Sequence, residues 1–274
     1  MISEIPPARN TAVRLKTAAK AFADNLTSYD MLAATVLAMV VGHLVQFFGF
    51  GGAYGEWLRV PERILWPVFF VVFGYNVGRP LDRDLLFWGG AVFFVKSALF
   101  MEGGLFPLPV LVTMAIVRLT LEPLMAFALQ GRLYFWGVTV VLVCFAPLSG
   151  NYSEFGTLIA LLSMAGWLAR NRNAVPKDVL SVKEFFFVCC FAYALVLQHF
   201  YHKSAASPFF VSLAGNACVF ALLYNFRDRI LAAVRRRPSD AVEKAASFIG
   251  HKSLQIYAVH FIVIYAVLGY ALAD

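Results

Sequence analysis

The stretch from Met31 to Gly49 limits what this chain can fold into more than any other part of the sequence. It carries no formal charge and is long enough to cross the hydrocarbon core of a bilayer as a helix. It also contains His43, and an ionisable side chain inside a membrane helix is costly and usually functional. At helical spacing, one face of this stretch is formed by Thr35, Met39, Gly42, His43 and Gln46. We therefore expect His43 to point into a bundle of helices rather than toward lipid.

Composition extends this interpretation to the whole chain. Of its 274 residues, 61% are hydrophobic and 14% are charged, whereas a soluble domain is about 45–50% apolar. The expected fold class is an all-α, polytopic membrane helix bundle over residues 29–274, preceded by a basic cytoplasmic arm over residues 1–28. Nine apolar segments are candidate spans, at about 31–49, 64–78, 85–101, 105–122, 133–148, 154–169, 184–200, 208–226 and 254–272.

The basic residues orient these segments. With the N-terminus inside, 18 of the 23 Lys and Arg residues fall in cytoplasmic segments and 3 fall outside, as the positive-inside rule predicts. The net charge of +7 then needs no nucleic-acid partner. The linker 227–252, with its Arg235–Pro238 run, is expected to lie on anionic lipid at the cytoplasmic face.

Polar groups that gather on the predicted outer side are candidates for chemistry. They include His43, Arg63 at the start of the second segment, and Ser149 and Glu154 in the loop that precedes the sixth segment. His199 and His202 are expected at the interface. In the last segment, His260 shares a helical face with Ser253 and Tyr257. Imidazole titrates near neutral pH, so His43 and His260 are suited to proton transfer if they meet.

Three further charges lie within apolar segments. Arg118 and Glu122 are spaced i, i+4 and are expected to neutralise each other, the alternative being that Arg118 helps to hold an anionic cofactor. Lys96 lies in mid-segment, and Glu102 or Asp30 is a plausible partner for it. The four cysteines have no metal-ligand spacing, and no metal is expected. Motifs of soluble hydrolases, zinc peptidases and nucleotide folds do not occur.

Four short landmarks occur in the same order as in a known family. They are Met39-Val40-Val41-Gly42-His43, then Arg63-Ile64-Leu65-Trp66-Pro67-Val68-Phe69 with Gly74-Tyr75-Asn76, then Pro147-Leu148-Ser149-Gly150 with Tyr152 and Gly156, and finally Ile256-Tyr257-Ala258-Val259-His260. On these residues the chain resembles the TraX family, membrane acetylases of conjugative pilin subunits. The resemblance covers about residues 30–170 and 250–272.

The resemblance implies an enzyme of the bacterial inner membrane that transfers an acetyl group from acetyl-CoA to the N-terminal amine of a pilin subunit. His43 would be the general base, and His260, positioned by Tyr257, a second proton carrier. Arg63 and backbone N–H groups around Ser149 would stabilise the oxyanion. Glu154 belongs to the same predicted site. The cofactor phosphates would meet Arg118, Arg79 and Arg132 on the inner side.

One position departs from the family pattern, which has an Asp directly before the first His where this chain has Gly42. Glu154 or Asp30 is expected to replace that carboxylate through space. The departure also favours an alternative, a pilin-maturation enzyme that forms another amide, such as a head-to-tail cyclase. A non-enzymatic pilin assembly factor, a small-solute transporter and a sugar O-acyltransferase are the remaining candidate functions.

Overall fold

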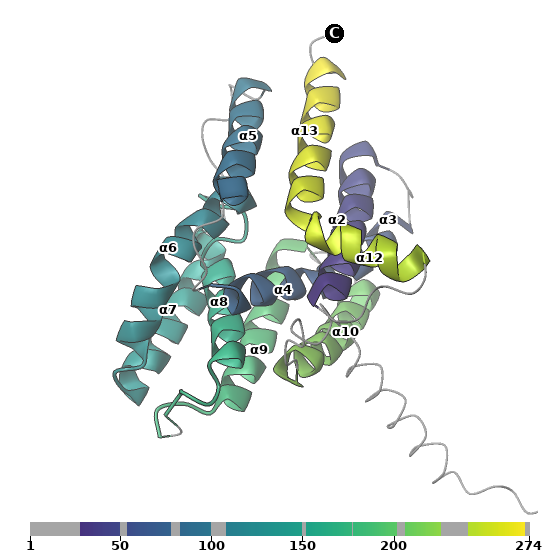
Figure 1. Ribbon diagram of the computed structural model, residues 1–274. Coiled ribbons are helices and arrows are strands. Elements are labelled where there is room, and N and C mark those ends of the chain that lie inside the picture. The colour runs from purple at the N-terminus through teal and green to yellow at the C-terminus, as the bar shows by residue number, and fades with distance from the viewer. Residues whose placement is uncertain are drawn as a thin grey trace, which may run out of the picture.

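The computed structural model describes residues 28–49, 54–77, 83–99, 108–149, 152–176, 178–201, 206–225 and 241–271. Within these ranges the named elements are all helices, so the fold class is all-α as predicted (Figure 1). The elements are α2 (Ser28–Phe48), α3 (Gly55–Leu58), α4 (Val60–Tyr75), α5 (Arg83–Leu99), α6 (Val110–Ala128), α7 (Arg132–Ser149), α8 (Thr157–Arg170), α9 (Val182–Tyr201), α10 (Ala206–Asn225), α12 (Ala241–His251) and α13 (Ser253–Ala271). Residues 1–27 of the predicted arm, Arg79, His202 and the Arg235–Pro238 run lie outside the described residues.

Several of these helices are suited to a bilayer. In the described ranges, α2, α6, α7 and α10 are long and apolar enough to cross a membrane. The pair α12–α13 is bent by 70° and passes the same test when its two helices are counted as one span. These four or five helices indicate a membrane protein. Each of the nine predicted segments contains a helix, whereas nine crossings and a cytoplasmic N-terminus stay predictions.

The helix α4 lies at the centre of the fold. It runs across the middle of the view in Figure 1 and packs against α2, α8 and α10. The run from Val68 to Val72 is buried on every side, which is typical of a helix surrounded by other helices. Because Arg63, Trp66 and Glu62 all lie on α4, the packing of this helix fixes the position of three polar side chains.

Small residues allow α4 and α8 to approach closely. A Cβ atom added at Gly74 would overlap the backbone of Ser163, and one added at Gly166 would overlap the carbonyl oxygen of Val71. Glycine and other small residues have this role in membrane bundles, because close contact of backbones replaces the hydrophobic effect as the driving force. The seam between α4 and α8 therefore depends on Gly74 and Gly166.

Substituting Gly166 with Ala is expected to destabilise the protein by about 1–3 kcal/mol, since the added methyl group meets backbone atoms that cannot move aside. The measurement is thermal unfolding in detergent. Gly137→Ala on α7 is the matched control, because a Cβ there meets nothing within 4 Å. Equal stability of the two variants would show that the seam is looser than described.

The last helix of the described chain lies beside the first. Helix α13 packs against both α2 and α5, and α12 packs across the start of α2, where Gly250 lies against the backbone of Tyr29 (Figure 1). The amphipathic α12 leaves Phe248 exposed, and Lys252 is exposed at the break before α13. This arrangement places the middle of α13 next to the second half of α2.

Candidate functional site

His43 on α2 and His260 on α13 are in direct contact. Nδ1 of His43 lies 2.9 Å from Nε2 of His260, and the two rings are stacked with centroids 5.2 Å apart. His43 is only 4% exposed and faces the bundle together with Thr35 and Met39, as the helical spacing predicted. Gln46, expected on the same face, is exposed. The structure thus joins two histidines that are 217 residues apart in the sequence.

The hydrogen bonds around this pair assign its tautomers. Nδ1 of His260 lies 3.1 Å from the carbonyl oxygen of Ile256, which can only accept, so Nδ1 carries the proton. In neutral His260, Nε2 is then an acceptor and receives a hydrogen bond from the Nδ1–H group of His43. It follows that Nε2 of His43 is unprotonated whenever His43 is neutral.

Glu62 on α4 completes a chain of three side chains. Its Oε1 atom lies 3.4 Å from Nε2 of His43, and the side chain is 2% exposed. The Glu62 carboxylate and the unprotonated Nε2 of His43 are both hydrogen-bond acceptors, so they can be joined by one shared proton. When that proton is absent, Nε2 of His43 is free to act as a base. The Glu62–His43–His260 triad, as we call these three residues, can therefore take up and release one proton at Nε2 of His43.

Gly42 makes room for Glu62. A Cβ atom at position 42 would overlap the Glu62 carboxylate and lie 2.9 Å from the Glu62 Cβ. The carboxylate that accompanies His43 thus comes from Glu62. The structure corrects the prediction that Asp30 or Glu154 takes this place, since Glu154 is held by Lys96 and the start of α6. A carboxylate beside an imidazole orients the ring and stabilises its protonated form.

Two arginines surround the Glu62 end of the triad. Nε of Arg59 lies 3.8 Å from Glu62 Oε2, and Nη2 of Arg59 donates a 2.8 Å hydrogen bond to Gln46. Arg63 is 3% exposed and pairs with Glu56 at 2.9 Å, while Tyr193 donates a hydrogen bond to the Arg63 carbonyl oxygen. Arg63 therefore lies beside the triad, and α3 contributes Glu56 to the same cluster. The role predicted for Arg63 at an oxyanion stays a prediction.

Aromatic side chains enclose the two imidazoles. Phe261 lies 4.5 Å from the ring of His43 by centroids, and Trp66 and Tyr257 lie at 6.2 Å and 6.5 Å. Tyr257 is also 5.3 Å from His260, the neighbour predicted for it. This low-dielectric surrounding strengthens electrostatic interactions within the triad.

Ser149 and Glu154 form a different cluster. Oγ of Ser149 accepts a 2.9 Å hydrogen bond from the Thr157 N–H group at the start of α8, and Glu154 accepts one from the Val110 N–H group at the start of α6. Glu154 also pairs with Lys96 of α5 at 3.3 Å, which is a partner that the sequence did not suggest for Lys96. The predicted partner Glu102 lies outside the described residues. The contacts of both residues tie helix ends together.

The link between the two clusters is aromatic. Phe155, adjacent to Glu154, lies 3.6 Å by ring centroids from Trp66, which in turn lies near His43. Phe155 has φ of 63°, a left-handed backbone conformation that is unusual outside glycine and is followed here by Gly156 at 48°. The turn before α8 is thus shaped so that Phe155 packs on Trp66.

Substituting Glu154 with Gln is expected to lower stability by about 1–3 kcal/mol, because the Lys96 ammonium loses a charged partner in an apolar bundle. Adding Lys96→Met should recover part of the loss. Unfolding in detergent measures the effect. A catalytic role for Glu154 would instead appear as lost activity in a variant of wild-type stability.

Two of the predicted cofactor arginines, Arg118 and Arg132, lie within the described residues. Nη1 of Arg118 donates a 3.1 Å hydrogen bond to the carbonyl oxygen of Asn76 at the end of α4, and Glu122 is exposed. Arg132 is exposed at the first residue of α7. The proposed roles of these two arginines stay predictions.

Sequence reasoning missed Glu62 and Arg59. Hydropathy assigns both to an outer loop, although Arg59, Glu62 and Arg63 are spaced i, i+3, i+4 and share a helical face. A second signal was Gly42, which leaves space beside His43 for a side chain from another helix. Together these two signals point to a carboxylate from α4.

Comparisons with models of protein families, with curated proteins and with solved structures find no match for this chain. Membership of the TraX family therefore stays a prediction, and the chemistry of the site follows from its own side chains.

Proposed function

We propose that the protein is an acyltransferase of the bacterial inner membrane that moves an acetyl group from acetyl-CoA to the N-terminal amine of a pilin subunit. The observation that carries this proposal is the Glu62–His43–His260 triad, in which Glu62 and His43 are buried and one proton position is vacant when Glu62 is ionised. An amine is a nucleophile only after it loses a proton, and the triad is a base positioned for that step. The donor and the pilin acceptor come from the family resemblance.

The reaction balances with the side chains present. The ammonium of the acceptor gives one proton to Nε2 of His43, and Glu62 stabilises the resulting imidazolium. The amine nitrogen then forms a bond to the thioester carbonyl carbon, and Arg59 and Arg63 supply positive charge for the oxyanion. The carbon–sulfur bond breaks, the amide nitrogen loses its second proton, and the thiolate leaves and takes up one proton. One proton is released overall.

The departure at Gly42 no longer favours the cyclase alternative. The missing carboxylate beside His43 was its motivation, and Glu62 supplies one. A His–carboxylate pair is compatible with acetyl transfer to an amine.

The test is acetyl transfer by the purified full-length protein in lipid nanodiscs, with acetyl-CoA and a pilin whose N-terminus is free. We expect the intact mass of the pilin to rise by one acetyl group. A loss of one water would instead identify the cyclase. An unchanged pilin mass with folded protein would reject both reactions and favour a non-enzymatic role in assembly.

A further inference from the structure

A cavity of about 200 Å³ lies at the junction of five helices near the start of α2. Its lining includes Leu32 of α2, Phe69 of α4, Asn76 directly after α4, Leu85 of α5, Arg118 of α6 and Ser253 of α13. Apolar walls with a few polar groups at one end are typical of ligand sites. We name this space the inner cavity.

The inner cavity lies one aromatic layer from the triad. Phe69 lines the cavity and stacks on Tyr257, with ring centroids 5.9 Å apart and an interplanar angle of 29°. Tyr257 in turn lies 5.3 Å from the ring of His260. A slender ligand that moved this pair of rings would reach the histidines from the cavity.

The polar end of the inner cavity is positive. Arg118 is anchored there by its hydrogen bond to the carbonyl oxygen of Asn76. Arg170 of α8 donates to the carbonyl oxygen of Val77 at 2.6 Å, one residue further along the chain. Two guanidinium groups therefore converge on the end of α4, and guanidinium is the side chain that best binds phosphate.

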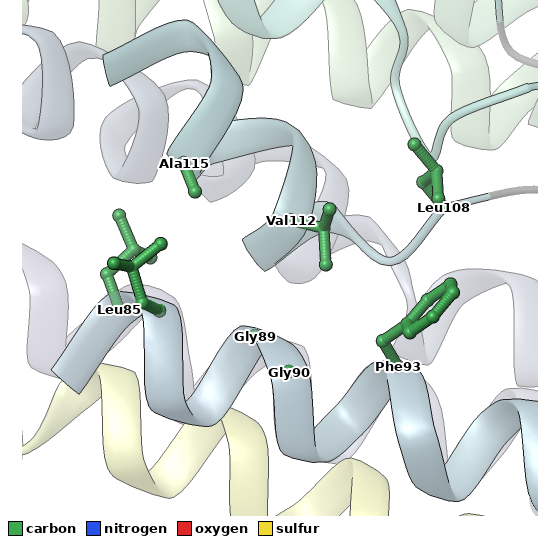
Figure 2. A pocket seen from close by; sticks show the side chains of 8 residues that line it. Leu85, Gly89, Gly90, Phe93, Leu108, Val112 and Ala115 are labelled. Carbon is green, nitrogen blue, oxygen red and sulfur yellow. The ribbon is translucent and has the colours of Figure 1, made fainter. Parts of the chain in front are cut away.

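A second cavity provides a contrast. It has a volume of about 300 Å³, lies between α5 and α6, and is lined by Leu85, Gly89, Phe93, Val112 and other apolar residues (Figure 2). Such a lining cannot hold an anion. Leu85 lines both cavities, so the two spaces are adjacent, but of the two only the inner cavity has polar side chains in its lining.

We infer that the inner cavity binds the pantetheine arm of the acyl donor, with the donor phosphates at Arg118 and Arg170 and the thioester directed past Phe69 and Tyr257 toward the triad. This inference rests on the proposed function. A volume of 200 Å³ corresponds to about seven water molecules at about 30 Å³ each. The slender thioester end of the arm fits that space, whereas a nucleotide does not and would lie outside it, beside the arginines.

Binding to the full-length protein in nanodiscs tests the inference without any acceptor. The probes are coenzyme A and uncharged pantetheine, measured by calorimetry. Arg118→Gln is expected to weaken coenzyme A binding about tenfold or more and to leave pantetheine binding unchanged, because only the former carries phosphate. Lys183→Gln, which removes one charge from an exposed position at the start of α9, is the matched control and should change neither affinity by more than about twofold.

Filling the cavity gives an independent result. Met114→Trp and Leu254→Trp each place a large ring in the inner cavity, and both variants should lose binding of coenzyme A and of pantetheine. Two variants are used because Met114 is buried and Leu254 is only half-buried, so that at least one should fold. Wild-type affinity in either folded Trp variant, or an equal effect of Arg118→Gln and Lys183→Gln, would overturn the inference.

The outcome separates this inference from the proposed function. Coenzyme A binding that follows the pattern above, without acetyl transfer to pilin, supports the cavity assignment and rejects the reaction. Acetyl transfer by a Trp variant with normal coenzyme A affinity contradicts the assignment of the inner cavity as the donor site and supports the proposed reaction. No binding of coenzyme A to the wild-type protein rejects both.

Discussion

Replacing His43 with Asn is expected to lower kcat/KM for acetyl transfer by about 10²- to 10⁴-fold, the usual contribution of a general base. Asn retains a hydrogen-bonding side chain between α2 and α13 but has no nitrogen that can take a proton at neutral pH. The loss should therefore be in activity rather than in folding. Release of free thiol from acetyl-CoA in the presence of pilin measures it.

The control for this variant is His251→Asn. His251 lies exposed on α12, so the same chemical change there removes an imidazole outside the triad. We expect its activity to be that of the wild type. If His43→Asn also acetylated pilin at the wild-type rate while remaining folded, the triad could not be the base.

The double variant Glu62→Ala with Gly42→Asp moves the carboxylate from position 62 to position 42. We expect it to recover activity that each of the two single substitutions removes. Glu62→Ala should lower kcat/KM by about 10- to 100-fold, because His43 loses the group that orients it and stabilises its protonated form. Gly42→Asp alone should be at least as impaired, since its side chain would overlap Glu62 and bring a second negative charge. In the double variant, the new carboxylate occupies the volume that Glu62 leaves beside His43.

Rescue in the double variant is the decisive observation. A purely structural role for Glu62 predicts additive losses, whereas a shared role of the two carboxylates predicts strong non-additivity. Gly42→Ala with Glu62→Ala is the matched control, because it fills part of the same volume without a charge. Equal activity of the two double variants would show that the carboxylate is not required.

Much of the fold could be predicted from hydropathy. The apolar segment at 105–122 predicts a helix, and α6 begins within it and runs on through Pro123 to Ala128. Helical periodicity also placed His43 on a buried face and Tyr257 beside His260. The angle of 70° between α12 and α13 was not predictable. The polar residues His251 and Lys252 at the break indicate where the helix is interrupted but not the direction in which the chain continues.

The site was only partly accessible to sequence reasoning. Orientation by basic residues indicates on which side of a membrane a residue lies, but not which residues are neighbours within that side. Ser149 and Glu154 were grouped with His43 for that reason, although they join helix ends with Thr157, Val110 and Lys96. Glu62 was overlooked for the opposite reason, since it follows a loop and its burial depends on the packing of α4.

The position of the two histidines has a consequence for biosynthesis. His43 and His260 belong to the first and last described helices, and ribosomes deliver a chain from its N-terminus. The earlier helices can therefore insert while no base is assembled. The Glu62–His43–His260 triad is complete only once α13 lies against α2, so premature termination products and proteolytic fragments that lack α13 would lack His260 and, under the proposed function, would be inactive.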